Sequence, residues 1–162
     1  MDAKTGEDTG TTATHESPQQ LAERVGRVMY NDDMASQALG MKLVSTAPGQ
    51  ATMTMTVRAD MLNGHKTCHG GFLFSLADSA FAFACNSRNN VTVASSGSID
   101  FLAPAFEGDV LSASATEYSL AGRTGVYDVH ITNQDGKQIA VFRGRSYRIK
   151  GLVTSEPTTA QA

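Results

Sequence analysis

The sequence contains no tryptophan, and among its 162 residues there are only two cysteines and four prolines. A small secreted protein that depends on disulfides would carry more cysteine, so Cys68 and Cys85 favour a reduced setting. The first sixteen residues lack the apolar stretch of a secretory signal, and no later run reaches membrane-spanning length without polar breaks. The sequence therefore predicts a cytoplasmic protein that does not enter a membrane.

The sequence also lacks a large excess of charge of either sign, because the formal net charge is only −3 and the pI is near 5.7. Such a chain has no broad basic field to attract nucleic acid, so no nucleic-acid partner is expected. The length fits one domain of roughly 100–200 residues. Both ends are polar and without hydrophobic periodicity, which predicts disordered tails over residues 1–16 and 152–162 and a folded domain over 17–151.

Hydrophobic periodicity changes along the chain. A Ser17 cap and an apolar stripe predict a helix from Pro18 to near Asn31, followed by a helical turn over residues 33–39. Residues 41–57 then alternate with period two around a turn, which predicts a hairpin. After residue 90 we expect an antiparallel meander of four strands, over residues 91–102, 109–120, 124–133 and 137–149.

Between these sheet segments, residues 70–85 are almost wholly apolar and show no strand-like alternation. This pattern predicts a helix that is buried on nearly every side. A sheet curled around one hydrophobic helix would explain why that helix has almost no polar face. The predicted fold is therefore α+β, a hotdog fold in which an antiparallel sheet wraps around one long hydrophobic helix.

Asp78 is the only formally charged residue between Lys66 and Arg88, so it lies alone on this helix. An unpaired carboxylate that is buried costs free energy or has a raised pKa. In one reading, Asp78 is satisfied by hydrogen bonds from Ser75, Ser79 or backbone groups, or by a basic residue from elsewhere in the fold. In the other reading, its isolation serves a function. Helix composition alone leaves both readings open.

Two glycines, Gly70 and Gly71, open the same helix. The first N–H groups of a helix have no intrahelical acceptor and lie at the positive end of its dipole, where they can hold a developing oxyanion. A simpler reading is that the glycines only turn the chain into the helix. Asp78 lies eight positions beyond Gly70, which corresponds to ~12 Å along the axis. One substrate carbonyl group can contact both Gly70 and Asp78 more easily in a dimer, where the Gly70 end of one helix faces Asp78 of a second, antiparallel helix.

Several motifs occur in register: Asn63-Gly64-His65, Cys68-His69-Gly70-Gly71, Ser75-Leu76-Ala77-Asp78, Ala84-Cys85-Asn86-Ser87, Ile99-Asp100-Phe101-Leu102, Thr124-Gly125-Val126-Tyr127-Asp128 and Phe142-Arg143-Gly144. Together they resemble the phenylacetate-degradation thioesterases of the PaaI type. The resemblance extends over roughly residues 20–151 and covers neither tail.

This resemblance implies a hotdog homodimer that assembles into a homotetramer and hydrolyses phenylacetyl-CoA or its ring-hydroxylated relatives without metal or cofactor. It implies that Asp78 either attacks the thioester carbonyl or activates a water, and that the Gly70 amide, with Gly71 adjacent, polarises the carbonyl. It also implies supporting roles for the Ser79 hydroxyl and the loop residue Asn63. The sequence departs from the family pattern at Lys66, Phe72 and Ala103.

Other polar residues give weaker signals. His65, Cys68 and His69 lie close together but lack recognisable metal-ligand spacing, so no metal site is expected, and His69 is predicted to hold the loop through hydrogen bonds. Cys68 lacks a base spaced to activate it as a nucleophile. For the CoA phosphates we expect basic ligands among the later turns and strands, namely Arg143, Arg145 and Arg123.

Two other functions remain open at this point. A hotdog hydratase or dehydratase would pair a carboxylate with a histidine, and His65 and His69 are candidates. A non-catalytic sensor would bind acyl-CoA in the same place without hydrolysing it.

Overall fold

The computed structural model describes residues 16–155, so residues 1–15 and 156–162 of the predicted tails lie outside the described residues. Two helices precede the sheet, and one long helix interrupts it. The elements are α1 (Pro18–Asp32), α2 (Met34–Ala38), β1 (Lys42–Ala47), β2 (Gln50–Thr56), the 3₁₀ helix η1 (Ala59–Met61), α3 (Gly70–Asn86), β3 (Asn90–Phe101), β4 (Val110–Ala121), β5 (Thr124–Thr132) and β6 (Gln138–Leu152).

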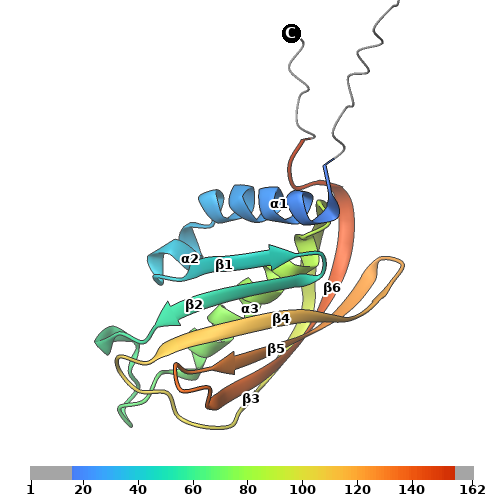
Figure 1. Ribbon diagram of the computed structural model, residues 1–162. Helices are drawn as coiled ribbons and strands as arrows, with labels where there is room; N and C mark the ends of the chain where they lie inside the picture. The colour runs from blue at the N-terminus through green and yellow to red at the C-terminus, as the bar shows by residue number, and fades with distance from the viewer. Residues whose placement is uncertain (1–15, 156–162) are drawn as a thin grey trace, which may run out of the picture.

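The six strands form one antiparallel sheet in the order β1-β2-β4-β5-β6-β3, and the sheet curls around α3 (Figure 1). Helix α1 packs beside β1 at one edge of the sheet. This is the α+β arrangement predicted from the sequence, with a single long helix inside the curve. Within residues 16–155, no helix is both long and apolar enough to span a bilayer.

The predicted four-strand meander is wrong in one respect. Strands β4, β5 and β6 follow one another in the sheet, but β3 pairs with β6 instead of β4. Tight turns join β4 to β5 and β5 to β6, whereas residues 102–109 connect β3 to β4. A connection of that length need not form a hairpin. It carries the chain from the sheet edge back to the centre.

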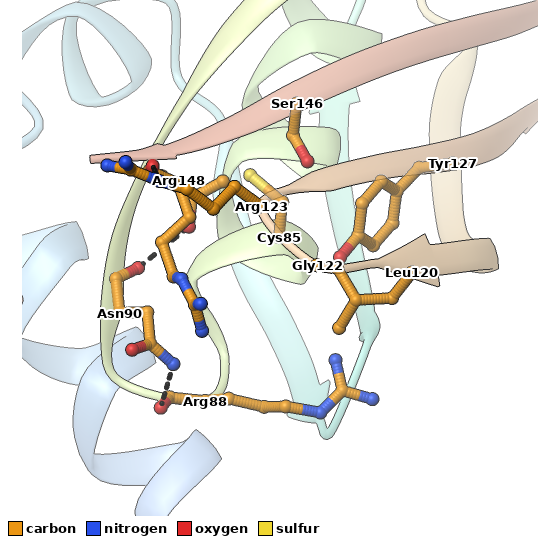
Figure 2. Close-up of a pocket in the computed structure, with 10 residues that line it drawn as sticks. Cys85, Arg88, Asn90, Leu120, Gly122, Arg123, Tyr127, Ser146 and Arg148 are labelled. Atoms are coloured by element: carbon orange, nitrogen blue, oxygen red, sulfur yellow. Dashed lines mark hydrogen bonds between the residues drawn. The ribbon is translucent and has the colours of Figure 1, made fainter.

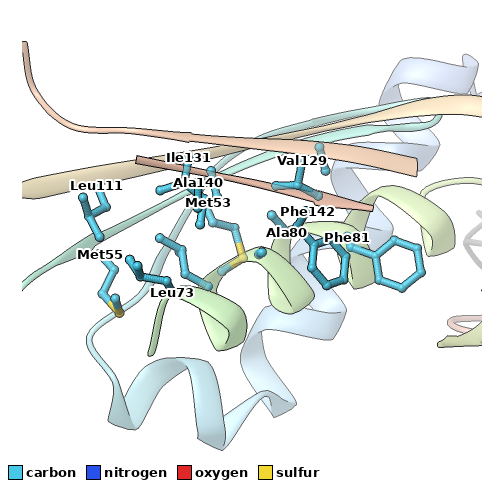
Figure 3. Packing of buried hydrophobic residues seen from close by; sticks show 14 of the residues in the cluster. Met53, Met55, Leu73, Ala80, Phe81, Leu111, Val129, Ile131, Ala140 and Phe142 are labelled. Carbon is cyan, nitrogen blue, oxygen red and sulfur yellow. The ribbon is translucent and has the colours of Figure 1, made fainter. Parts of the chain in front are cut away.

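The core lies between the concave face of the sheet and α3 (Figure 3). In β2, Met53 and Met55 are buried and alternate with partly exposed threonines, as the period-two pattern predicts. Helix α3 contributes large side chains such as Phe81, whose ring lies 5.9 Å from that of Phe142 in β6. These contacts anchor α3 against the sheet and leave little freedom in its position.

One face of α3 is less buried than the sequence predicts. Gly71 is exposed, and Ser75, Asp78 and Ala82 are partly exposed. These residues recur at intervals of four, three and four positions, so they form one stripe along the helix. The overall hydrophobicity of α3 predicted burial on nearly every side, but a single chain does not cover this stripe.

The predicted domain boundaries shift slightly in the described part of the chain. Glu16, assigned to the first tail, forms an ion pair with Arg24 of α1 at 2.8 Å. Strand β6 continues to Leu152, and Arg24 also donates a hydrogen bond to the Ser155 carbonyl at 2.8 Å. The two ends of the folded region thus leave the molecule side by side (Figure 1).

Asn89 anchors the end of the folded region. Its side chain donates to the Thr154 carbonyl and accepts from the Thr154 N–H, both at 2.9 Å, from a buried position with φ of 61°. Asn89→Ala removes both hydrogen bonds and puts alanine in the left-handed region, so unfolding should require about 2–4 kcal/mol less. Urea denaturation measures this, and the neighbouring Asn90→Ala is the control. Equal loss in both variants would contradict the assigned role of Asn89.

Candidate active site

The first turn of α3 leaves one backbone N–H group free. The side chain of His69 is the N-cap and accepts the Gly71 N–H at Nδ1, 3.0 Å away. The Phe72 N–H donates to the His69 carbonyl, also at 3.0 Å. Among the described residues, the Gly70 N–H has no acceptor. Gly70, not Gly71, is therefore the available donor at the positive end of this helix.

The loop before α3 is held in shape by Asn63. Its side-chain amide donates to Thr67 Oγ1 at 3.0 Å, and its Oδ1 accepts the His65 N–H at 2.9 Å. Asn63 and Gly70 line the same cavity, which has a volume of about 410 Å³. The structure thus brings together two of the predicted site residues, and Asn63 also builds the loop that leads to Gly70.

Asp78 lies two helical turns further on, in the partly exposed stripe of α3. It makes no hydrogen bond or ion pair with any other residue in the range 16–155. Burial raises the pKa of its carboxyl above the usual value for aspartate. A partly buried carboxylate without a donor is a poor structural element and a good base or nucleophile.

The serines near Asp78 do not satisfy it. Ser75 donates to the Gly71 carbonyl at 2.8 Å, and the Ser79 hydroxyl shares a hydrogen bond of 2.8 Å with Ser36 of α2. Ser79 therefore ties α3 to α2. The structural alternative for Asp78, in which these serines or a distant cation neutralise it, is not realised in the described part of the chain.

The two thiols are unsuited to nucleophilic attack. Burial raises the pKa of Cys68 to about 11 and that of Cys85 to about 12, so both are protonated near neutral pH. No group of three or more His, Cys, Asp or Glu side chains that could hold a metal ion occurs among the described residues. Asp78 and the Gly70 amide thus remain the candidate reactive groups of this region.

Comparison with known proteins identifies the family of this chain. A model of the thioesterase superfamily matches residues 65–140, which include both Gly70 and Asp78. The acyl-coenzyme A thioesterase PaaI of Escherichia coli K12 is 54% identical over 128 residues, which cover 79% of this chain and 91% of the E. coli protein. The chain belongs to the PaaI-type thioesterases.

Solved structures agree with this assignment and confirm the hotdog fold. The E. coli PaaI protein from the phenylacetic acid degradation operon superposes with a TM-score of 0.83 at 51% identity, covering 84% of this chain and 99% of that one. A hypothetical thioesterase of Streptococcus pneumoniae, solved with coenzyme A, gives a TM-score of 0.65 at 27% identity over 69% of this chain and 90% of that one.

In this PaaI-type thioesterase the predicted CoA-binding arginines do not lie in the Gly70 cavity. Arg143 is on the outer face of the sheet, where it forms a two-pronged ion pair with Asp128 at 2.6 and 2.7 Å. Arg145 is exposed on the same face, two residues along β6. Arg123 donates to the Arg148 carbonyl at 2.9 Å and lies over the Tyr147 ring.

Phe101 lines the same cavity as Gly70, a position for which no role was predicted. A Cβ atom on Gly70 would lie 2.8 Å from Cζ of Phe101, so the ring covers the start of α3. Phe101 ends β3, is 55% exposed and lines the cavity with Leu102. Alternation along β3 was the available signal, because Ile99 and Phe101 fall on the side of the strand that faces α3.

Proposed function

We propose that this protein hydrolyses acyl-CoA thioesters, with Asp78 and the Gly70 amide as the catalytic groups. The observation that carries the proposal is the partly buried, unpartnered carboxylate of Asp78 on the helix whose first N–H is free. The relationship to the acyl-coenzyme A thioesterase of E. coli supports the same chemistry. Release of free thiol from a panel of aromatic and aliphatic acyl-CoAs tests it.

In this mechanism the Gly70 N–H donates to the thioester carbonyl oxygen and stabilises the negative charge that develops there. Asp78 either removes a proton from a water that attacks the carbonyl carbon, or attacks that carbon itself to form a mixed anhydride that water then cleaves. In both routes the carbon–sulfur bond breaks, CoA thiolate leaves and the free acid forms. Both routes need an ionised Asp78.

We further propose that two copies of the chain complete each site. Gly70 and Asp78 lie ~12 Å apart along one helix, too far for one carbonyl to contact both. The stripe of Gly71, Ser75, Asp78 and Ala82 offers small side chains on which a second α3 can pack closely. An antiparallel pair of α3 helices would bring the Gly70 end of one chain to Asp78 of the other, on each side of a two-fold axis.

Strand β3 supports the same dimer. It is at the edge of the sheet and pairs only with β6 among the described strands. Its twelve residues include one charge, Asp100, and no proline, so it lacks the usual protection against pairing with another chain. Pairing of β3 with β3 of a second copy would place the two α3 helices side by side. Assembly of such dimers into a tetramer remains a prediction.

For the substrate we propose phenylacetyl-CoA or a ring-hydroxylated relative in the cytoplasm, because the E. coli PaaI protein comes from the phenylacetic acid degradation operon. The hydratase alternative loses support, since His69 Nδ1 is engaged in capping α3. Binding of CoA phosphates by Arg123, Arg143 and Arg145 stays a prediction. Arg143 is the weakest of the three, because Asp128 already neutralises it.

The pH dependence of activity follows from the raised pKa of Asp78. Because only the carboxylate acts, kcat/KM should fall with decreasing pH around a midpoint above about 3.9, the value for an exposed aspartate. A pH–rate profile measured with an acyl-CoA checks this. A midpoint at or below the exposed value would contradict the assigned environment of Asp78.

A further inference from the structure

A second cavity lies at the opposite end of α3 from Gly70, and three arginines surround it (Figure 2). Arg88 follows the helix, Arg123 lies in the turn between β4 and β5, and Arg148 lies on β6. Cys85 and Tyr127 form part of its wall. The cavity has a volume of about 30 Å³, enough for two waters or one carboxylate group at roughly 10–15 Å³ per water.

The charges around this cavity are unbalanced. Arg88 forms an ion pair with Glu117, and Arg123 donates to the Arg148 carbonyl and lies over the Tyr147 ring. The guanidinium of Arg148 makes no hydrogen bond or ion pair within the described residues. Among the described residues, Glu117 is the only acid that forms an ion pair with any of these three arginines. An anion in the cavity would relieve their repulsion.

A serine hydroxyl in the cavity wall is available to the same ligand. Ser146 is only 1% exposed and lines the cavity, yet its hydroxyl has no hydrogen-bond partner among residues 16–155. No buried side-chain nitrogen or oxygen lacks a partner among the described residues, so the Ser146 hydroxyl reaches the open space of the cavity, where it can donate a hydrogen bond to a ligand or a water. Ser146 and Arg148 are neighbours on β6 whose side chains lie on the concave side of the sheet, and Figure 2 shows both at the cavity.

We propose that this cavity binds one small anion of carboxylate size, held by the Arg148 guanidinium and the Ser146 hydroxyl. The anion is either a free carboxylate or the terminal carboxylate of an acyl group. The second source rests on the proposed thioesterase function. The geometry allows this second source, because the cavity lies within reach of an acyl chain that starts at Asp78. Cys85, in the cavity wall, is seven positions beyond Asp78 on the same face of α3, a distance of ~10 Å.

Titration with sodium acetate at constant ionic strength, followed by ¹H–¹⁵N NMR, tests the site. Saturable shifts confined to the cavity, at Gly122 and Arg148, are expected in the parent protein. Arg148→Gln should weaken acetate binding by about tenfold or more, and Ser146→Ala by about two- to tenfold. The control Arg27→Gln removes an exposed arginine of α1 and should bind acetate like the parent.

No saturable shift in the parent, or equal acetate affinity in the parent and Arg148→Gln, would overturn the proposal. The source of the anion follows from kcat/KM for suberyl-CoA, whose extended chain is long enough to reach the cavity, and the uncharged octanoyl-CoA. A selective loss with suberyl-CoA in Arg148→Gln assigns the site to the acyl group, and equal changes assign it to a free anion. Acetate binding without hydrolysis of any thioester would refute the proposed function and leave the anion site intact.

Discussion

Asp78→Asn is expected to lower kcat for thioester hydrolysis by about 10²–10⁴-fold, the range that a positioned general base contributes. Asparagine keeps the shape of the side chain but cannot accept a proton or form an acyl intermediate. Asp78→Ala should lose at least as much. Free-thiol release measures both variants, and Asp135→Asn, the same change in the exposed β5–β6 turn, is the control.

The fold of Asp78→Asn should gain stability, in contrast to its activity. The pKa of Asp78 is raised in the folded state, so its neutral form favours folding below the unfolded-state pKa, and this advantage is lost as pH rises through the folded-state pKa. At pH 7 the uncharged asparagine should therefore unfold at a higher temperature than the parent. Unchanged turnover in Asp78→Asn, or a lower melting temperature at pH 7, would count against the assigned role.

Gly70→Ala is expected to lower kcat by about 10²-fold, as the loss of one oxyanion-hole donor does. The added Cβ would lie 2.8 Å from the Phe101 ring and would crowd the approach to the free N–H. Gly64→Ala, in the loop before α3, is the control, because a Cβ added there would meet nothing within 4 Å. Its effect should be much smaller. Equal losses from the two substitutions would refute the choice of Gly70.

A double variant separates crowding of the Phe101 ring from crowding of the amide. Phe101→Ala removes the ring that the new Cβ would touch. If the carbonyl binds at the Gly70 N–H, Gly70→Ala should still lower activity in the Phe101→Ala background. Recovery of activity in the double variant would instead assign the loss to displacement of the ring.

The sequence predicted those parts of the fold that depend on local periodicity. Alternation over residues 51–57 identified β2, and the apolar run after Gly70 identified α3. The position of β3 was not predictable in this way, because strand pairing depends on long-range contacts that chain order does not encode. The partly exposed stripe of α3 was also missed, since small residues such as Gly71 and Ala82 look alike on a buried and an exposed helix face.

The candidate site was predictable in its spacing but not in its details. Counting from Gly70 to Asp78 gave the separation along the helix. The choice between Gly70 and Gly71 depended on the ring of His69, whose direction no sequence pattern specifies. The arginines that converge, Arg88 and Arg148 among them, are far apart in the sequence, whereas alternation along β6 places Arg143 on the outer face.

The most direct test of the shared active site mixes two inactive variants. Asp78→Ala and Gly70→Ala subunits are unfolded together, refolded and assayed for thiol release. A mixed dimer would contain one site with an intact Gly70 amide and an intact Asp78. With random assortment about one quarter of the parent activity should return, because half of the dimers are mixed and each has one intact site. Activity no higher than that of the separate variants would contradict a site shared between two chains.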